Sequence, residues 1–355
     1  MGLSLADLTV DNLRCLEHVE ASLHAGHNLI WGGNGSGKTS LLEAIFLLGR
    51  GRSFRTRNSE RLIRHGQPQL VVFGRTAGPV PRSVGVQVSK VGGTRARISG
   101  ESAGSLTELS QAFPVQVIDP GVHKLVEEGG FRRRRWLDWA VFHVEPSFGD
   151  HWVRYTRALK QRNAALKSQP AQATAWDVEV ARLGELIAES RRQLLEQLQA
   201  HWRAAVASLA GLDVDLHYSR GWLQDVPLAQ ALKDAYPRDQ LRGSTHPGPH
   251  RADILIRLNG RPAREVLSRG QQKLVAIAMT LAQLRLLQGV TQVVPTLLLD
   301  DPAAELDGGH LAQFIEQVKA LQCQLVLTSL EPDFHSFGAP DRVFHVEQGV
   351  VRGVV

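Results

Sequence analysis

The chain has 355 residues, 43% of them hydrophobic, which is enough to bury a full-sized core and excludes a disordered or disulfide-stapled protein. At about 150 residues per domain, this length predicts roughly two structural units. The two cysteines, Cys15 and Cys323, exclude a disulfide framework and a cysteine-based zinc cluster, and they fit a reducing compartment. The net charge of +6 favours a polyanionic partner such as nucleic acid, although a compositional bias of the source genome would give the same surplus.

No apolar run approaches the roughly 20 residues that cross a bilayer. The first ten residues include Asp7 and lack a basic segment followed by an apolar one, so no secretory signal is expected. We therefore expect a soluble, cytoplasmic protein with no membrane partner.

The N-terminal part predicts short strands around one apolar helix. Alternating apolar and polar residues predict a strand over residues 3–10, and a second strand over 27–31 stops at a glycine pair. A largely buried helix is expected over 40–48, followed by an arginine-rich stretch over 51–66. Further short strands are predicted at 71–75, 84–88, 95–98 and 115–118.

The pattern becomes helical between residues 132 and 209, with breaks at Pro146 and around Pro170. We interpret this stretch as a helical hairpin inserted into a mixed α/β unit. Beyond it, predicted strands alternate with predicted helices: strands at 214–218, 254–258, 296–299 and 324–328, helices at 270–288 and 310–321. This alternation predicts a mainly parallel sheet covered by helices.

A phosphate-binding loop is predicted between the second strand and the first helix. Residues 32–39 match the pattern G-x-x-x-x-G-K-[ST] in full, and glycines there let backbone N–H groups surround phosphates. Lys38 would bridge the β and γ phosphates, and the Thr39 hydroxyl would bind Mg²⁺. The predicted ATP-binding residues are Gly32, Gly33, Asn34, Gly35, Ser36, Gly37, Lys38, Thr39 and Ser40.

Two carboxylates follow the apolar strand at 296–299. In a parallel sheet, the carboxyl ends of the strands form the edge at which ligands bind. Asp300 would hold Mg²⁺ together with Thr39, and Asp301 would act with Lys38 in catalysis by orienting or deprotonating the attacking water. Because aspartate reaches one methylene less far than glutamate, we expect slow turnover.

Residues 267–273, with the sequence LSRGQQK, precede a predicted helix and the acidic strand. Ser268 can cap that helix, and by itself this indicates no more than an N-cap. In this order along the chain, Ser268, Arg269, Gly270 and Gln271 resemble the signature motif of ABC-type ATPases, and Asp307 resembles their D-loop aspartate. The resemblance implies that the signature completes the ATP site of a second subunit, giving an ATP-bound homodimer that hydrolysis opens.

Further motifs narrow the class. They are GRSFR at 51–55, RRRRWLD at 132–138, Tyr155 with QRN at 161–163, and GPHR at 248–251. With a short helical insert instead of long coiled-coil arms, the chain resembles the RecF family. The resemblance implies an α/β ABC-type ATPase head formed by residues 1–125 and 243–355, with an inserted helical lid at 126–242.

The same resemblance implies a DNA replication and repair ATPase with ATP and Mg²⁺ as cofactors. Members bind single- and double-stranded DNA at gap junctions and support RecA loading with RecR and RecO. The run Arg132, Arg133, Arg134 and Arg135 is a candidate DNA contact, although it could equally form the polar face of a helix. Arg14 resembles a basic residue near the nucleotide, or is a solvated turn residue. His246 and His250 are not expected to bind zinc, because Pro247 and Pro249 exclude a helix there.

The chain departs from transporter ATPases in three places. The strand at 115–118 ends in Asp119 and Pro120 where many of these ATPases place a glutamine, and nearby Gln116 is not assigned to that role. Thr328 and Ser329 stand where a switch histidine is usual, and Arg269 replaces a glycine-like position of the signature. Two alternatives to a DNA-binding ATPase are an ATPase subunit of a membrane transporter and a nucleotide-gated scaffold with incidental hydrolysis. The basic surplus, the helical insert and the missing histidine speak against the transporter subunit.

Overall fold

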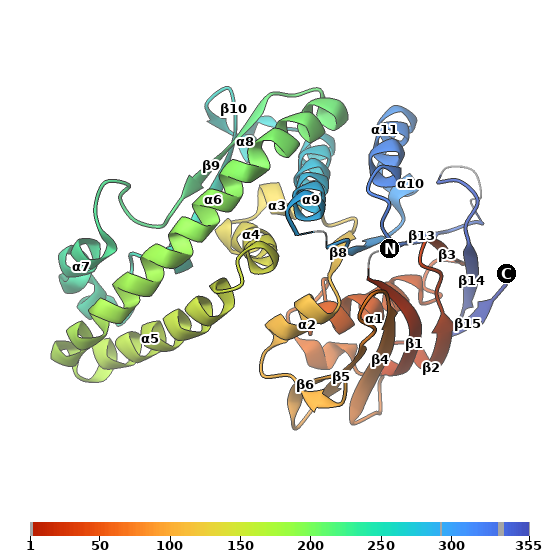
Figure 1. Ribbon diagram of the computed structural model, residues 1–355, viewed down its shortest axis with the longest axis horizontal. Helices are drawn as coiled ribbons and strands as arrows, with labels where there is room; N and C mark the ends of the chain where they lie inside the picture. Colours follow the sequence, from red (N-terminus) through yellow and green to blue (C-terminus); the bar gives the residue numbers. More distant parts are fainter. Residues whose placement is uncertain (1–2, 292, 333–336, 355) are drawn as a thin grey trace. The chain divides into compact units, whose positions relative to one another are not determined.

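The structure is a computed structural model that describes residues 3–291, 293–332 and 337–354 (Figure 1). The chain forms two compact units: residues 1–122 with 287–355, and residues 123–286. The sequence pattern predicts the second domain boundary at 242/243, whereas the second unit continues to Leu286. The extension has a physical cause, because β10 (Asp253–Leu258) pairs in antiparallel register with β9 (Val214–Ser219), and both belong to the helical unit.

The first unit contains a six-stranded core sheet in the order β15-β14-β3-β13-β12-β8. Five of its strands are parallel, which confirms the predicted mainly parallel sheet, and only β15 runs antiparallel. The strands are β3 (His27–Trp31), β8 (Val115–Ile118), β12 (Thr296–Leu299), β13 (Leu325–Ser329), β14 (Arg342–Glu347) and β15 (Val350–Gly353). Helices α10 (Pro302–Glu305) and α11 (Gly308–Lys319) follow β12.

A second sheet of this unit is antiparallel, in the order β2-β1-β4-β5-β6-β7. The strands predicted near residues 3–10, 71–75, 84–88 and 95–98 exist, but they belong to this separate sheet rather than to the parallel one. Its strands are β1 (Ser4–Leu13), β2 (Leu16–Ser22), β4 (Gln69–Ala77), β5 (Ser83–Ser89), β6 (Gly93–Ile98) and β7 (Glu101–Ser102). Strand β2 was not predicted, because five of its seven residues are partly or fully exposed and its apolar signal is weak.

Helix α1 (Lys38–Arg50) joins the two sheets of the first unit. Every residue of α1 except Thr39 is buried, and its apolar side chains share one core with residues of both sheets. Such a helix is apolar on all sides because both of its faces are covered. The unit also contains α2 (Leu106–Ala112) and a short 3₁₀ helix at Ser59–Leu62.

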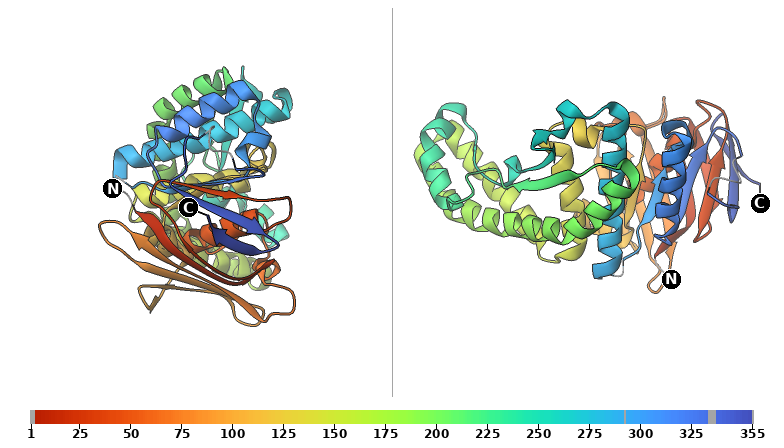
Figure 2. Two further views of the ribbon diagram at one scale, coloured as in Figure 1. Left: turned by 90° about the vertical axis from the view of Figure 1, so that its right-hand side faces the viewer. Right: turned by 90° about the horizontal axis from the view of Figure 1, so that it is seen from above.

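The second unit is mainly helical. It contains α3 (Lys124–Glu127), α4 (Gly130–Val144), α5 (Phe148–Ser168), α6 (Asp177–Ala210), α7 (Leu228–Arg242) and α8 (Ala263–Val266), with a three-stranded sheet of β9, β10 and β11 (Arg261–Pro262). Short 3₁₀ helices lie at Pro170–Trp176 and Pro249–Arg251. The predicted hairpin and its breaks are confirmed: α4 ends just before Pro146, α5 ends just before Pro170, and α5 and α6 run side by side (Figures 1 and 2).

Helix α9 (Arg269–Thr291) begins in the second unit and ends in the first. Among the described helices it alone is long and apolar enough to cross a membrane by length and composition. However, 72% of its most apolar stretch is buried inside the protein. A buried helix of this kind is typical of a protein core.

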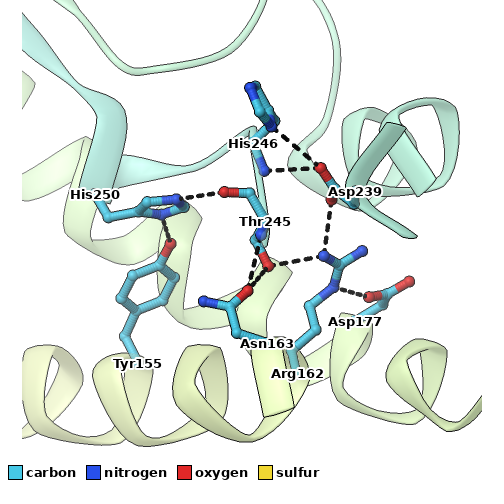
Figure 3. A network of polar contacts seen from close by, with 8 residues as sticks. All are labelled: Tyr155, Arg162, Asn163, Asp177, Asp239, Thr245, His246 and His250. Carbon is cyan, nitrogen blue, oxygen red and sulfur yellow. Dashed lines mark hydrogen bonds and ion pairs between the residues drawn. The ribbon is translucent and has the colours of Figure 1, made fainter. Parts of the chain in front are cut away.

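A buried polar network holds the loop that follows α7 (Figure 3). The Arg162 guanidinium, on α5, donates to Asp177 at 2.7 Å, to Asp239 at 2.8 Å and to the Thr245 hydroxyl at 2.8 Å. The Thr245 hydroxyl in turn donates to the Asn163 side-chain oxygen at 2.7 Å. Arg162 and Asp239 are completely buried, so each neutralises a charge that would otherwise be costly to bury.

Candidate nucleotide-binding site

The predicted phosphate-binding loop lies between β3 and α1, at the carboxyl end of a parallel strand. The Gly32 amide donates to the Ser329 carbonyl at 3.3 Å, and the Gly349 amide donates to the Ser36 carbonyl at 2.8 Å. A Cβ at Gly32 would lie 2.1 Å from the Val346 carbonyl oxygen, so no side chain fits there. The neighbouring strands β13 and β14 therefore fix the path of the loop.

Lys38 begins α1 and points back into the loop. Its ammonium group donates to the Gly32 carbonyl at 2.6 Å and to the Gly33 carbonyl at 2.9 Å. Burial lowers the pKa of Lys38, while the nearby carboxylates of Asp301 and Asp300 oppose that shift. Two backbone carbonyls of the loop thus hold the ammonium group of Lys38 beside the glycines of the predicted phosphate-binding loop.

The structure brings Thr39 and Asp300 together although they are 261 residues apart. The Thr39 hydroxyl donates to Asp300 Oδ1 at 3.0 Å, and Asp300 ends β12 at the same edge of the sheet. A hydroxyl and a carboxylate are hard oxygen donors of the kind that Mg²⁺ prefers. The donor set therefore fits the predicted metal ion.

Thr328, at the end of β13, organises the acidic pair. Its hydroxyl donates to Asp300 Oδ1 at 2.9 Å and accepts the Asp301 amide at 2.9 Å. Asp301 has a left-handed backbone (φ 50°, ψ 56°), which is unfavourable for a non-glycine residue unless neighbouring groups hold it. From the sequence, Thr328 is notable only because a histidine is absent there; the signal for its role is a polar residue at the end of an otherwise apolar strand.

The Arg14 side chain pairs with a carboxylate rather than with solvent. Its guanidinium contacts both oxygens of Glu43, at 2.5 and 3.0 Å, and the Ser53 hydroxyl donates to the same carboxylate at 2.5 Å. Glu43 lies on α1 and is completely buried. Arg55 of the basic stretch lies 3.6 Å away on the same side. These contacts tie the β1–β2 turn and the 51–56 segment to the helix that begins at Lys38.

The signature-like segment forms an exposed helix N-terminus in the second unit. The Ser268 hydroxyl accepts the Gln271 amide at 3.3 Å, while the Gln271 side chain accepts the Ser268 amide at 3.0 Å. This reciprocal pair is a capping box, which explains why α9 begins at Arg269. Ser268, Arg269 and Gly270 are exposed, and a Cβ at Gly270 would meet nothing closer than 4.0 Å.

Asp307 caps α11. Its carboxylate accepts the His310 amide at 3.1 Å and lies 2.7 Å from the His310 ring. These hydrogen bonds lower the pKa of Asp307, so it is ionised at neutral pH. The side chain is 70% exposed, which leaves it accessible.

The arginine run at the start of α4 does not form one free basic face. Arg133 is buried: it pairs with both Asp253 oxygens, at 2.8 and 2.9 Å, and donates to three backbone carbonyls. Arg132 pairs with Glu128 at 2.5 Å, and Arg134 donates to the Ala252 carbonyl at 2.5 Å. A buried, fully engaged guanidinium is not available to DNA, so Arg133 is better explained as a structural residue joining α4 to β10.

Comparisons with known proteins show the family of this chain. Residues 4–352 match the family model described as the RecF/RecN/SMC N terminal domain. DNA replication and repair protein RecF of Shewanella sp. (strain MR-4) is 38% identical over 98% of this chain and 99% of its own length. The chain belongs to the RecF family. RecF of Vibrio atlanticus (strain LGP32) is 39% identical with the same coverage of both chains.

Solved structures extend the RecF-family likeness to the whole fold. Structures of the recombination mediator protein RecF in the RecFOR pathway, as RecF-ATP and RecF-ATPrS, give TM-scores of 0.90 and 0.87 at 26% identity. Both cover 100% of this chain and at least 98% of their own. An Smc head domain from Pyrococcus furiosus, at 15% identity and a TM-score of 0.59, shares the fold alone. Together these likenesses confirm the predicted α/β ATPase-head fold.

Proposed function

We propose that this RecF-family chain is a cytoplasmic, ATP-dependent DNA-binding protein of replication and recombinational repair. ATP binding closes a homodimer that holds DNA near junctions of single- and double-stranded DNA, and slow hydrolysis releases it. RecR and RecO act with it in supporting RecA loading. The observation that carries the proposal is the convergence of Lys38, Thr39 and Asp300 on one edge of the core sheet.

The chain's own residues assign the roles at this edge. Backbone amides of residues 32–39 surround the phosphates, and Lys38 moves from the loop carbonyls to the β and γ phosphates. Thr39 and Asp300 would hold Mg²⁺, which supplies charge neutralisation at those phosphates. Asp301 orients or deprotonates the attacking water, with its backbone fixed by Thr328.

The second half of each ATP site comes from the partner subunit. Ser268 and the exposed start of α9 would face the γ-phosphate of the other copy, where the helix dipole favours an anion. The exposed carboxylate of Asp307 would meet the same segment of its twin. Both are surface features that a single chain leaves accessible.

We propose that Arg132, Arg134 and Arg135 contact DNA and that Arg133 does not. The first three side chains are partly exposed, whereas Arg133 is committed to Asp253. Phosphate contacts of this kind release counterions, so DNA binding should weaken steeply as salt rises.

The decisive experiment measures molar mass by light scattering with and without ATP, and with a gapped duplex. Wild type should become a dimer with ATP and bind the gapped duplex, while Lys38→Ala stays monomeric. Asp301→Asn should bind ATP, hydrolyse it poorly and remain dimeric on DNA. If the molar mass of wild type were the same with and without ATP, the proposed ATP-dependent dimer would be wrong. Unchanged DNA release with Asp301→Asn would instead favour the scaffold with incidental hydrolysis.

A further inference from the structure

The antiparallel sheet of the first unit has a groove of about 880 Å³ on the face opposite the core. Alternate residues of each strand point to opposite faces, and Val72 and Val86 point into the core. The other face presents Val71 and Phe73 on β4, Gly85 and Gln87 on β5, and Arg95 and Arg97 on β6. We call these six residues the sheet groove. All of them lie in one compact unit and outside the nucleotide site.

Strand register places the groove residues in two rows across the sheet. One row runs Glu20, Thr9, Phe73, Gly85, Arg97, and the next runs His18, Asp11, Val71, Gln87, Arg95. Each row contains one acidic residue on β1 or β2, an apolar side chain on β4 and an arginine on β6, and in the second row His18 lies 2.7 Å from the carboxylate of Asp11. On this face the negative charges therefore lie on β1 and β2, the positive charges lie on β6, and the apolar floor lies between them.

Gly85 leaves space above the middle of the sheet, although its backbone conformation does not require a glycine. It sits in the middle of β5, opposite Phe73 and Arg97, and its φ is not left-handed. An added Cβ would meet only the Phe73 ring, at 3.8 Å. Glycine inside a strand costs roughly 0.5–1 kcal/mol relative to alanine, and it often marks a place where another chain or a ligand approaches closely.

The guanidinium groups of Arg95 and Arg97 are exposed. Neither makes an ion pair or a hydrogen bond with any residue that the structure describes, although both residues pair through their backbones within the sheet. As alternate residues of one strand they lie roughly 7 Å apart along it. Two like charges held at this spacing match two carboxylates at alternate positions of an extended peptide.

We propose that the sheet groove binds a short acidic segment of a partner protein in extended conformation. The backbone of the segment passes above Gly85, its carboxylates at alternate positions face Arg95 and Arg97 on β6, and the apolar side chain between them faces Phe73 and Val71 on β4. A DNA strand fits less well, because the carboxylates of Asp11 and Glu20 lie across the floor from Arg95 and Arg97. The inference concerns a partner surface and does not depend on the proposed ATP cycle.

The test uses fluorescence anisotropy with the full-length protein. The probe is a fluorescein-labelled peptide of about eight residues, with aspartates flanking a central phenylalanine, so that in an extended conformation the aspartates point to one side and the phenylalanine to the other. Its control replaces every aspartate by asparagine, and an oligothymidylate of equal charge tests nucleic acid. Wild type should bind the acidic peptide. It should not bind the asparagine peptide or the oligothymidylate through the sheet groove.

Two variants address opposite features of the sheet groove. Arg95→Glu with Arg97→Glu removes the charge, and Gly85→Leu fills the floor; each should weaken peptide binding by about tenfold or more. The matched control, Arg257→Glu with Arg352→Glu, makes the same charge change at two exposed arginines elsewhere and should bind as wild type. No binding of the acidic peptide by wild type, or equal loss in the control, would overturn the proposal. Oligothymidylate binding that the groove variants abolish would assign the groove to nucleic acid instead.

Discussion

The hydroxyl of Thr328 lies 2.9 Å from Asp300 Oδ1 and 2.9 Å from the amide nitrogen of Asp301. A hydroxyl has one proton, so it donates to the carboxylate and accepts from the amide. One fully buried side chain therefore sets both the orientation of Asp300 and the left-handed backbone of Asp301. This is the place in the fold at which transporter ATPases usually carry a histidine.

Replacing Thr328 with valine should impair hydrolysis far more than nucleotide binding. Valine keeps the shape but loses both hydrogen bonds, and removing such an outer partner of a metal ligand typically costs about 10–100-fold in metal affinity or activity. We expect Thr328→Val to lower kcat and to raise the Mg²⁺ concentration needed for half-maximal ATPase activity, and Thr328→Ser to restore both. An unchanged Mg²⁺ requirement in Thr328→Val would contradict the positioning role.

Alanine should be tolerated at Gly33 but not at the crowded Gly32, so the two neighbouring variants form a matched pair. Alanine at Gly32 would place its Cβ 2.1 Å from the Val346 carbonyl, whereas alanine at Gly33 would meet nothing within 4 Å. Gly32→Ala should therefore force the backbone to move, lowering the free energy of unfolding by about 1–3 kcal/mol. It should also abolish binding of a fluorescent ATP analogue. Gly33→Ala should unfold at the wild-type urea concentration, and equal stability of the two variants would refute the argument.

Local patterns were enough to predict the loop at 32–39 and the Asp300–Asp301 pair, since each depends on residues that are neighbours in sequence. The contact between Thr39 and Asp300 followed from strand alternation, because parallel strands end at one edge. The antiparallel sheet did not follow, because its strands show the same short apolar runs as those of the core sheet. Arg133 shows another limit: its partner Asp253 is 120 residues away, and no local signal distinguishes it from Arg132.

The buried pair of Arg162 and Asp239 predicts a large loss of stability in the helical unit. Asp239→Ala would leave the completely buried Arg162 guanidinium with only Asp177 as a charged partner. Breaking a buried pair from one side costs about 3–5 kcal/mol. Urea unfolding followed by tryptophan fluorescence reports this unit, because every tryptophan except Trp31 lies within residues 123–286.

A control for this experiment lies on the same helix. Asp234 is exposed on α7 and contacts only the side chain of Gln230, at 2.7 Å, among the interactions of the described residues. Asp234→Ala should change the unfolding free energy by less than about 0.5 kcal/mol. If the two variants were equally stable, the network in Figure 3 would not carry the stability assigned to it.

His250 makes the helical unit sensitive to acid. Its Nε2 lies 3.1 Å from the Thr245 carbonyl, which can only accept, so Nε2 carries the proton. Nδ1 therefore accepts the Tyr155 hydroxyl at 2.6 Å, and the ring is neutral. Burial lowers the pKa of His250 to about 4; the Thr245 carbonyl opposes the shift, and the nearby Arg251, Arg134 and Arg191 add to it.

The direction in which pH changes stability follows from the pKa of His250 in the folded and unfolded states. In the unfolded chain His250 has an ordinary pKa near 6.5, so below that pH the unfolded state binds a proton that the folded state rejects. Stability should fall as pH drops from about 6.5 to about 4 and then level off, by roughly 3 kcal/mol for this group. His250→Gln can still donate to Thr245 and accept from Tyr155, and it does not titrate. Urea unfolding at several pH values should therefore show that the free energy of unfolding falls less steeply with acid in His250→Gln than in wild type. The control Tyr155→Phe leaves the imidazole in place and should keep the steep fall. Parallel curves for wild type and His250→Gln would mean that another group titrates.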